Sequence, residues 1–223
     1  MRQLVVLVIL LSPAVLVAQD ARLELTPTLG YMWGGQIQIE DRAFTHTTYD
    51  TNVDAAGAFG LVFGIPMAPR TWLELTVDRE ETRLKDSQGL FGEEPAGIIP
   101  PDDSSILDAS VTYLQVGGQW ELTTGPTRWF LTGSAGVAHF NFAVPLPDDT
   151  RLAISGGGGL KMDLTDRLGL RFGARVYWTD TDEGTARVQQ FQHQDCGATC
   201  SYVYSYQPSF LQTELSLGLT IKL

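Results

Sequence analysis

Residues Ile154–Trp178 read ISGGGGLKMDLTDRLGLRFGARVYW and contain the clearest structural pattern in the sequence. From Leu152 to Leu164 every second residue is apolar or glycine, and after a break at 165–167 the same alternation returns. Charged residues lie between the apolar ones in both halves: Lys161, Asp163, Arg171 and Arg175. A period of two is typical of β-strands, whose side chains point alternately to opposite faces. The stretch therefore predicts two strands joined by a tight turn, with one apolar face and one charged face.

The same alternation recurs along the chain, and helical spacing is not sustained anywhere. It marks eight candidate strands, at about Arg22–Glu40, Ala55–Pro66, Thr71–Arg83, Ile106–Leu122, Arg128–Ala143, Arg151–Leu164, Arg167–Thr179 and Ser209–Leu223. In the fourth run the apolar residues change parity, so we expect a β-bulge near Tyr113 to return them to one face. In the third run the apolar face stops at Val77, so the strand either extends past the apolar part of the sheet or shifts its register.

The connections between these runs alternate in length. Three are tight, namely Met67–Arg70, Thr123–Thr127 and Thr165-Asp166, and three are long, namely Asp41–Asp54, Leu84–Ser105 and Asp180–Pro208. The remaining one, Val144–Thr150, is intermediate. Outer-membrane barrels have short periplasmic turns at one end and longer extracellular loops at the other. The lengths predict an all-β, eight-stranded antiparallel up-and-down transmembrane β-barrel.

The first residues are typical of a secretory signal peptide. A positive start is followed by an apolar run, Leu4–Leu11, and by a small residue at Ala18. We expect residues 1–18 to be the signal peptide and residues 19–223 the barrel domain, in the cell outer membrane of a Gram-negative bacterium. An uncleaved anchor helix is the alternative, but the apolar run is shorter than the roughly 20 residues that a spanning helix needs.

The charged faces of the strands carry both signs in near balance. In a membrane barrel the polar face points inward, where opposite charges can neutralise one another in a narrow lumen. We expect a lumen charge network formed by Glu74, Asp78, Lys161, Asp163, Arg171, Arg175 and Glu214. The alternative is a soluble barrel with these charges in water and an apolar interior, such as a lipocalin-like carrier of an apolar ligand.

All five tryptophans lie near strand ends. Aromatic rings favour the two membrane–water interfaces, so we expect an interfacial girdle formed by Trp33, Trp72, Trp120, Trp129 and Trp178. The net charge of −11 argues against a nucleic-acid partner, because phosphates need cationic contacts. Nothing in the sequence indicates a cofactor.

The quoted stretch resembles the strand–turn–strand unit of the outer-membrane β-barrel domain superfamily, which includes OmpA-like and OmpX-like small barrels. WFLTGSAGVAHF, at 129–140, resembles the preceding strand of that family. The resemblance covers essentially the whole mature chain. It implies contact with outer-membrane lipid and lipopolysaccharide, and insertion by the barrel assembly machinery, which reads the last strand. LSLGLTIKL supplies the expected alternation there, although the chain ends in Leu223 where the family commonly has Phe or Trp.

The chain has two cysteines, Cys196 and Cys200, and in an exported protein we expect them to form a disulfide. A metal site with His193 and Asp195 is the sharper alternative, but it lacks ligands, and we expect no metal. The acidic loop residues, including the calcium-loop-like DTDEG at 180–184, are expected to be solvated charge. A lipid-modifying barrel enzyme would need a His-x-Ser pair, whereas His139 is followed by Phe and Asn.

We therefore expect a small non-enzymatic, porin-like outer-membrane barrel with a charge-plugged lumen. Its long outer loops suggest a structural or surface-interaction role with an extracellular partner that the residues do not identify. A lipid-modifying outer-membrane enzyme and the soluble carrier stay open as alternatives at this stage.

Overall fold

The computed structural model describes residues 22–41, 48–85, 106–142, 148–180, 184–192 and 199–223. Within them the chain forms ten strands: β1 (Glu24–Asp41), β2 (Thr48–Val53), β3 (Ala56–Ala68), β4 (Thr71–Lys85), β5 (Ile106–Glu121), β6 (Thr127–Phe142), β7 (Asp149–Asp163), β8 (Leu168–Thr179), β9 (Gly184–Gln192) and β10 (Thr199–Lys222). Among these residues no helix has the length and apolar character needed to cross a membrane.

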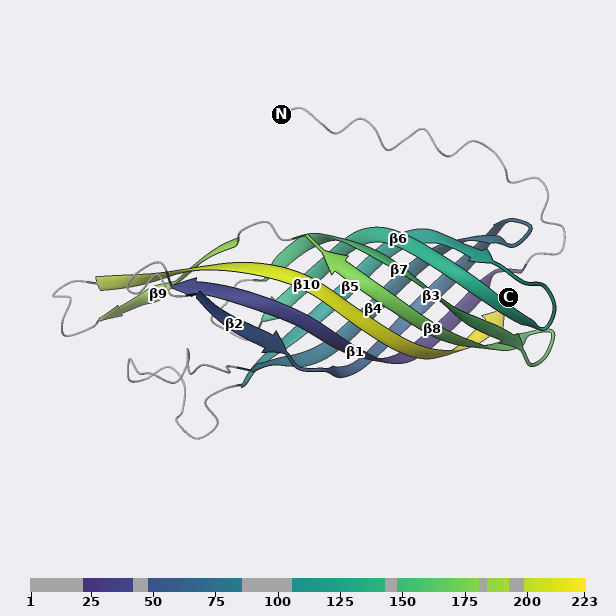
Figure 1. Cartoon of the computed structure of the whole chain (residues 1–223), viewed down its shortest axis with the longest axis horizontal. Coiled ribbons are helices and arrows are strands. Elements are labelled where there is room, and N and C mark those ends of the chain that lie inside the picture. Colours follow the sequence, from purple (N-terminus) through teal and green to yellow (C-terminus); the bar gives the residue numbers. More distant parts are fainter. Residues whose placement is uncertain (1–21, 42–47, 86–105, 143–147, 181–183, 193–198) are drawn as a thin grey trace, which may run out of the picture.

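Eight of the strands close into one barrel. Consecutive antiparallel pairs run β1-β3-β4-β5-β6-β7-β8-β10, and β1 pairs with β10 to close the wall (Figure 1). The tight turns β3–β4, β5–β6 and β7–β8 lie together at one end, on the right of the view. The predicted eight-stranded up-and-down barrel is confirmed.

Beyond the other end of the barrel, two hairpins continue as a four-stranded sheet in the order β2-β1-β10-β9. β1 makes the transition at Gly34 and Gly35, whose φ angles of 95° and 104° are in the region that favours glycine. The register with β10 shifts at this point, and β1 exchanges β3 for β2 as its partner. The sequence prediction missed β2 and β9, and it began the last strand ten residues too late, at 209 instead of 199.

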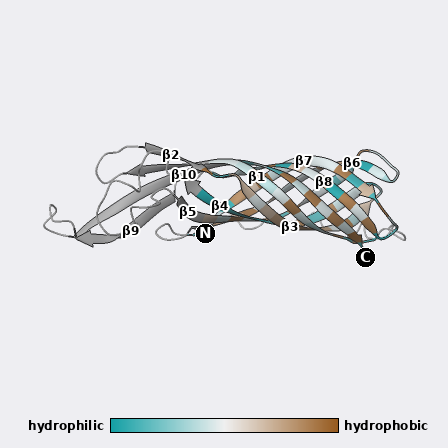
Figure 2. Cartoon of the chain, turned by 90° about the horizontal axis from the view of Figure 1, so that it is seen from below, coloured by the Kyte–Doolittle hydropathy of each residue, from teal (hydrophilic) through white to brown (hydrophobic). Residues whose placement is uncertain are grey.

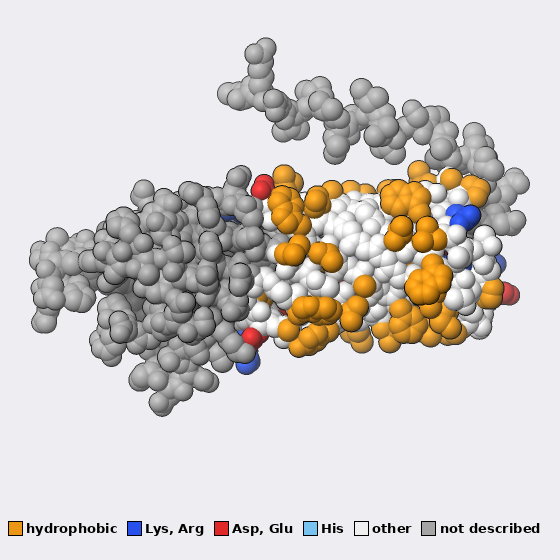
Figure 3. Space-filling view, in the orientation of Figure 1, with side chains coloured by type: hydrophobic (Ala, Val, Ile, Leu, Met, Phe, Trp, Pro, Cys, Tyr) orange, Lys and Arg blue, Asp and Glu red, His pale blue; other side chains and the backbone are white. Residues whose placement is uncertain are grey.

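The side-chain pattern separates an apolar wall from a polar interior. Figure 3 shows hydrophobic side chains on the outside of the barrel, with charged side chains toward its two ends, and Figure 2 shows hydrophobic and hydrophilic residues interspersed along the strands. Leu29, Leu152 and Leu215 are 74%, 67% and 54% exposed, whereas Glu74, Arg171 and Glu214 are at most 5% exposed. This is the arrangement of a membrane-spanning barrel, in which the exposed wall meets hydrocarbon.

Two local expectations are settled by the register. β5 pairs with β4 and β6 without any shift, so the predicted bulge near Tyr113 is wrong. The odd residues of β5, including Val111 and Tyr113, fill the interior, and the even ones, such as Leu114 and Val116, face outward. β4 pairs with β5 in continuous register as far as Lys85, so β4 extends past the apolar wall.

Candidate functional site: the charged interior

Strand parity brings the interior charges together. Inward residues follow at every second position of β4, as Glu74, Thr76, Asp78 and Glu80, and of β8, as Arg171, Arg175 and Tyr177. β7 contributes Lys161, and β10 contributes Gln212 and Glu214. Because burying an unpaired charge is expensive, the partners of these groups determine whether the interior is stable.

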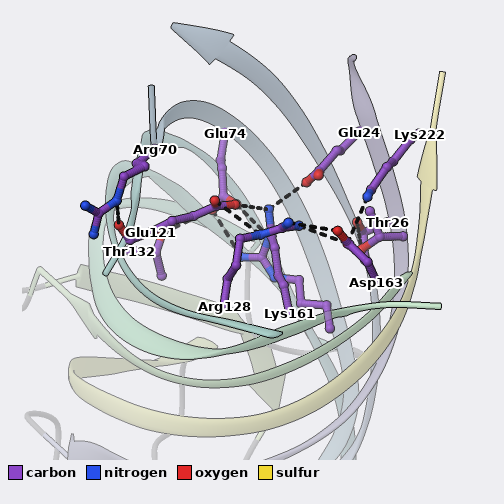
Figure 4. Close-up of polar contacts among 12 residues, drawn as sticks. Glu24, Thr26, Arg70, Glu74, Glu121, Arg128, Thr132, Lys161, Asp163 and Lys222 are labelled. Atoms are coloured by element: carbon purple, nitrogen blue, oxygen red, sulfur yellow. Dashed lines mark hydrogen bonds and ion pairs between the residues drawn. The ribbon is translucent and has the colours of Figure 1, made fainter. Parts of the chain in front are cut away.

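At the short-turn end, β7 and β1 form the first buried ion pair. Lys161 Nζ lies 2.6 Å from Glu24 Oε2 and 4.0 Å from Glu121 Oε1 (Figure 4). The ammonium group also lies 4.8 Å from the centroid of the Trp72 ring, within cation–π range. Lys161 therefore links three strands across the lumen.

A second ion pair crosses the middle of the barrel. Arg171 Nη1 and Nη2 donate to Glu74 Oε1 and Oε2 at 2.6 and 3.2 Å, which is a bidentate pairing. The Thr132 hydroxyl donates to Glu74 Oε2 at 3.1 Å, and the Arg171 guanidinium lies 4.4 Å from the Phe130 ring centroid. Glu74 of β4 is therefore held by side chains from two other strands, β6 and β8.

Farther toward the outer end, one hydroxyl lies between two carboxyl groups. Tyr177 Oη is 2.8 Å from Asp78 Oδ2 and 2.7 Å from Glu214 Oε2. Arg175 Nη1 lies 3.8 Å from Asp78 Oδ2, and its Nη2 lies 3.8 Å from Glu74 Oε2. Both distances are longer than a normal N–H···O hydrogen bond, so Arg175 acts on these carboxyls mainly through its charge.

Above this level, aromatic and amide groups complete the filling. The Tyr113 ring stacks on the Tyr177 ring with a centroid distance of 4.3 Å. The Tyr113 hydroxyl donates to Gln212 Oε1 at 2.7 Å, and Gln212 Nε2 donates to Glu80 Oε2 at the same distance. Gln212 therefore relays a hydrogen bond from β5 to β4.

The mouth at the short-turn end carries a partly exposed network. Arg128 donates to both oxygens of Asp163 at 2.8 and 2.9 Å, and Lys222 Nζ lies 2.8 Å from Asp163 Oδ1 (Figure 4). Arg128 Nε also lies 3.2 Å from Glu121 Oε2. These contacts join β5, β6, β7 and β10 at the rim.

The free space inside the barrel is unevenly distributed. The mid-barrel cavity, lined in part by Asp78, Arg171 and Arg175, measures about 20 Å³, which is room for a single water molecule. At the short-turn end an open vestibule of about 1040 Å³ is lined by groups that include Glu24 and Trp72. The lumen is therefore wide at this mouth and filled at its middle.

Six of the seven residues expected in the lumen network are buried in the interior, and Asp163 lies at the mouth with its side chain 24% exposed. The sequence reasoning did not include Glu24, Glu80, Tyr113, Tyr177 and Gln212 in this network. Parity was the available signal, because Glu80 continues the series of Glu74 and Asp78, and Tyr177 continues that of Arg171 and Arg175.

Four of the five tryptophans, Trp33, Trp120, Trp129 and Trp178, face outward and are 37–57% exposed. Trp72 is placed differently from our expectation. It shares its parity with the inward Glu74, and its ring lies beneath the Lys161 ammonium inside the barrel. A tryptophan near a strand end belongs to the outer wall only when its parity is that of the lipid face.

Two further predictions concern sites elsewhere. The expected Cys196–Cys200 link and the alternative metal site stay predictions, because Cys196, His193 and Asp195 lie outside the described residues. His139 is exposed on the outer wall, where its Nδ1 is 2.9 Å from Thr150 Oγ1. Among the described residues, no group of three or more His, Cys, Asp or Glu side chains is placed to hold a metal ion.

Comparison with known proteins bears on the fold alone. No protein-family model and no curated sequence matches the chain. The outer-membrane protein OprG of Pseudomonas aeruginosa superposes with a TM-score of 0.58 at 12% identity, over 91% of this chain and 97% of that one. Neisserial surface protein A superposes with a TM-score of 0.48 at 9% identity, over 90% of this chain and 97% of that one. The outer-membrane protein AlkL superposes with a TM-score of 0.48 at 14% identity, over 91% of each chain.

Proposed function

Since this protein is a small eight-stranded outer-membrane β-barrel, we propose that it is a non-enzymatic, closed anchor whose charge-filled lumen supports a surface-interaction role. The observation that carries this proposal is the filled middle of the barrel. There the Glu74–Arg171 pair crosses the lumen, and the adjoining cavity holds about 20 Å³. A pore for solutes needs a continuous aqueous path, and eight strands enclose only enough space for side chains to fill.

The extended hairpins support the second half of the proposal. The four-stranded sheet β2-β1-β10-β9 continues past the barrel on the side opposite the tight turns. In outer-membrane barrels that side is extracellular. A sheet that projects from a closed barrel is suited to presenting contact residues to an extracellular partner.

The soluble-carrier alternative loses its basis because the interior of this barrel is charged and its wall is apolar. A carrier of an apolar ligand needs the opposite arrangement. The lipid-modifying enzyme has no comparable support, since His139 lies on the wall beside Thr150 without a serine two residues later. We further propose that the barrel assembly machinery inserts the chain through β10.

Planar-bilayer recording tests the closed lumen. We expect the purified, refolded protein to give no stable ion conductance at neutral pH. Steady single-channel currents from a preparation that retains the heat-modifiable gel shift of a folded barrel would contradict the proposal. A variant with the middle pair removed, Glu74→Ala with Arg171→Ala, should conduct if these two side chains are the barrier.

A further inference from the structure

The contact between Tyr177, Asp78 and Glu214 contains more hydrogen bonds than its ionised form can make. Both O···O distances, 2.8 Å to Asp78 Oδ2 and 2.7 Å to Glu214 Oε2, are those of O–H···O hydrogen bonds. A tyrosine hydroxyl carries one proton, and an ionised carboxylate can only accept. With both carboxyls ionised, one contact would therefore bring two lone pairs together.

We propose that Asp78, Tyr177 and Glu214 form a buried proton-binding site in which one of the two carboxyl groups retains a proton at neutral pH. The protonated carboxyl donates to Tyr177 Oη, and the Tyr177 hydroxyl donates to the other carboxylate. Two protons then serve the two short contacts. The ligand of the site is a single exchangeable proton, and the inference does not depend on the proposed function.

Burial and the neighbouring carboxyls favour the extra proton, and the positive charge of Arg175 opposes it. Asp78 and Glu214 are 3% and 4% exposed, and Tyr177 is fully buried. Arg175 lies beside the site, but its closest approach to Asp78 is 3.8 Å. On β4 the neighbouring Glu80 is a further carboxyl, and Glu74 is engaged by Arg171. A carboxyl in such a position lowers its energy by holding a proton.

The described contacts from β5 and β10 next to the tyrosine pair are uncharged. β5 supplies the Tyr113 ring, stacked on Tyr177, and β10 supplies Gln212. Two glycines make room for the carboxyls. A Cβ on Gly60 of β3 would lie 2.0 Å from Asp78 Oδ1, and one on Gly30 of β1 would lie 2.9 Å from Glu214 Oε1. The packing therefore holds both carboxyls against the hydroxyl.

Infrared difference spectroscopy of the refolded protein in lipid tests the proposal directly. At neutral pH we expect a carbonyl band of a protonated carboxyl in the wild type. The band should be absent in both Asp78→Asn and Glu214→Gln, because an amide can donate an N–H to Tyr177 in place of the acid. Glu81→Gln, which alters a carboxylate exposed on the outer wall, should keep the band.

The variant Glu80→Gln tests whether the infrared band comes from the neighbouring Glu80 carboxyl instead of the proposed site. A wild type without any protonated-carboxyl band would overturn the proposal. It would equally be overturned by a band that disappears in Glu80→Gln and persists in both Asp78→Asn and Glu214→Gln. The gel shift of each variant verifies that it has folded before its spectrum is compared.

The pH dependence of folding provides a second readout. The folded site holds one proton that an ordinary carboxyl of the unfolded chain has lost at neutral pH, so stability falls as pH rises. As pH rises, we expect the folding equilibrium constant of the wild type, relative to that of Glu214→Gln, to fall about tenfold per pH unit. This fall should end at the pH where the folded site releases its proton. Identical slopes in wild type, Asp78→Asn and Glu214→Gln would contradict the proposal.

Discussion

Truncation of Glu74 to alanine is the sharpest perturbation of the interior. Glu74 is 2% exposed, and its carboxylate accepts two hydrogen bonds from Arg171 and one from Thr132. Its charge also lies 3.8 Å from Arg175. Glu74→Ala removes all these contacts at once and leaves the buried guanidinium groups of Arg171 and Arg175 without this carboxylate.

The expected loss of unfolding free energy depends on the contacts that the Arg171 guanidinium keeps in the variant. After truncation, its described contacts include the Phe130 ring at 4.4 Å, which is worth about 0.5–2 kcal/mol to a cation. Removing one partner of a buried ion pair typically costs about 3–5 kcal/mol. We expect Glu74→Ala to lower the free energy of unfolding by about this amount. Glu74→Met with Arg171→Met should recover most of the loss, because no charge is then stranded.

Urea unfolding in lipid vesicles, followed by tryptophan fluorescence and by gel mobility, measures these differences. The matched control is Glu81→Ala, which removes a carboxylate that is 70% exposed on the same strand and lies 3.4 Å from Arg79. An exposed pair of this kind contributes about 0–1 kcal/mol. If Glu74→Ala cost no more than Glu81→Ala, the ion pair could not be what stabilises the interior.

Three further substitutions test separate parts of the barrel. Gly159→Ala would bring a Cβ within 1.9 Å of the Phe172 carbonyl oxygen, so we expect about 1–3 kcal/mol of destabilisation in a urea titration. Its control is Gly57→Ala, whose Cβ would meet nothing within 4 Å and which should leave stability nearly unchanged. Leu217→Arg places a cation on the lipid face and should cost about 2–4 kcal/mol near the bilayer centre; an unchanged urea midpoint would place this residue outside hydrocarbon. Tyr113→Phe deletes the buried donor to an amide oxygen and should cost about 1–3 kcal/mol, and a stability equal to wild type would show that this hydrogen bond is dispensable.

The barrel itself could be predicted because its signals are local and repeated. Alternation defined the strands from Leu152 to Trp178, and the tight connections marked one end of the barrel. The outer sheet could not be found in this way. β2 and β9 lie within long connections, and their pairing to β1 and β10 depends on contacts that the barrel creates.

The interior was predictable as a set of charges but not as a set of pairs. Parity places Lys161, Arg171 and Glu74 on inward faces, yet which cation meets which carboxylate depends on the tilt of the strands around the barrel. Glu74 and Arg171 are 97 residues apart, and no pattern in the sequence connects them. Trp72 was misplaced because position along a strand was given more weight than parity.

Tryptophan fluorescence in vesicles of brominated lipid distinguishes an apolar wall from a charged interior. Trp120 pairs with Thr71, the residue next to Trp72, so the two tryptophans lie at similar depth in the membrane. Trp72 faces the lumen, whereas Trp120 is 50% exposed on the wall. In variants that keep a single tryptophan, with the other four replaced by phenylalanine, bromine on the acyl chains should quench Trp120 strongly and leave Trp72 nearly unquenched. Equal quenching of Trp72 and Trp120 would show that the barrel does not separate an apolar wall from a polar interior.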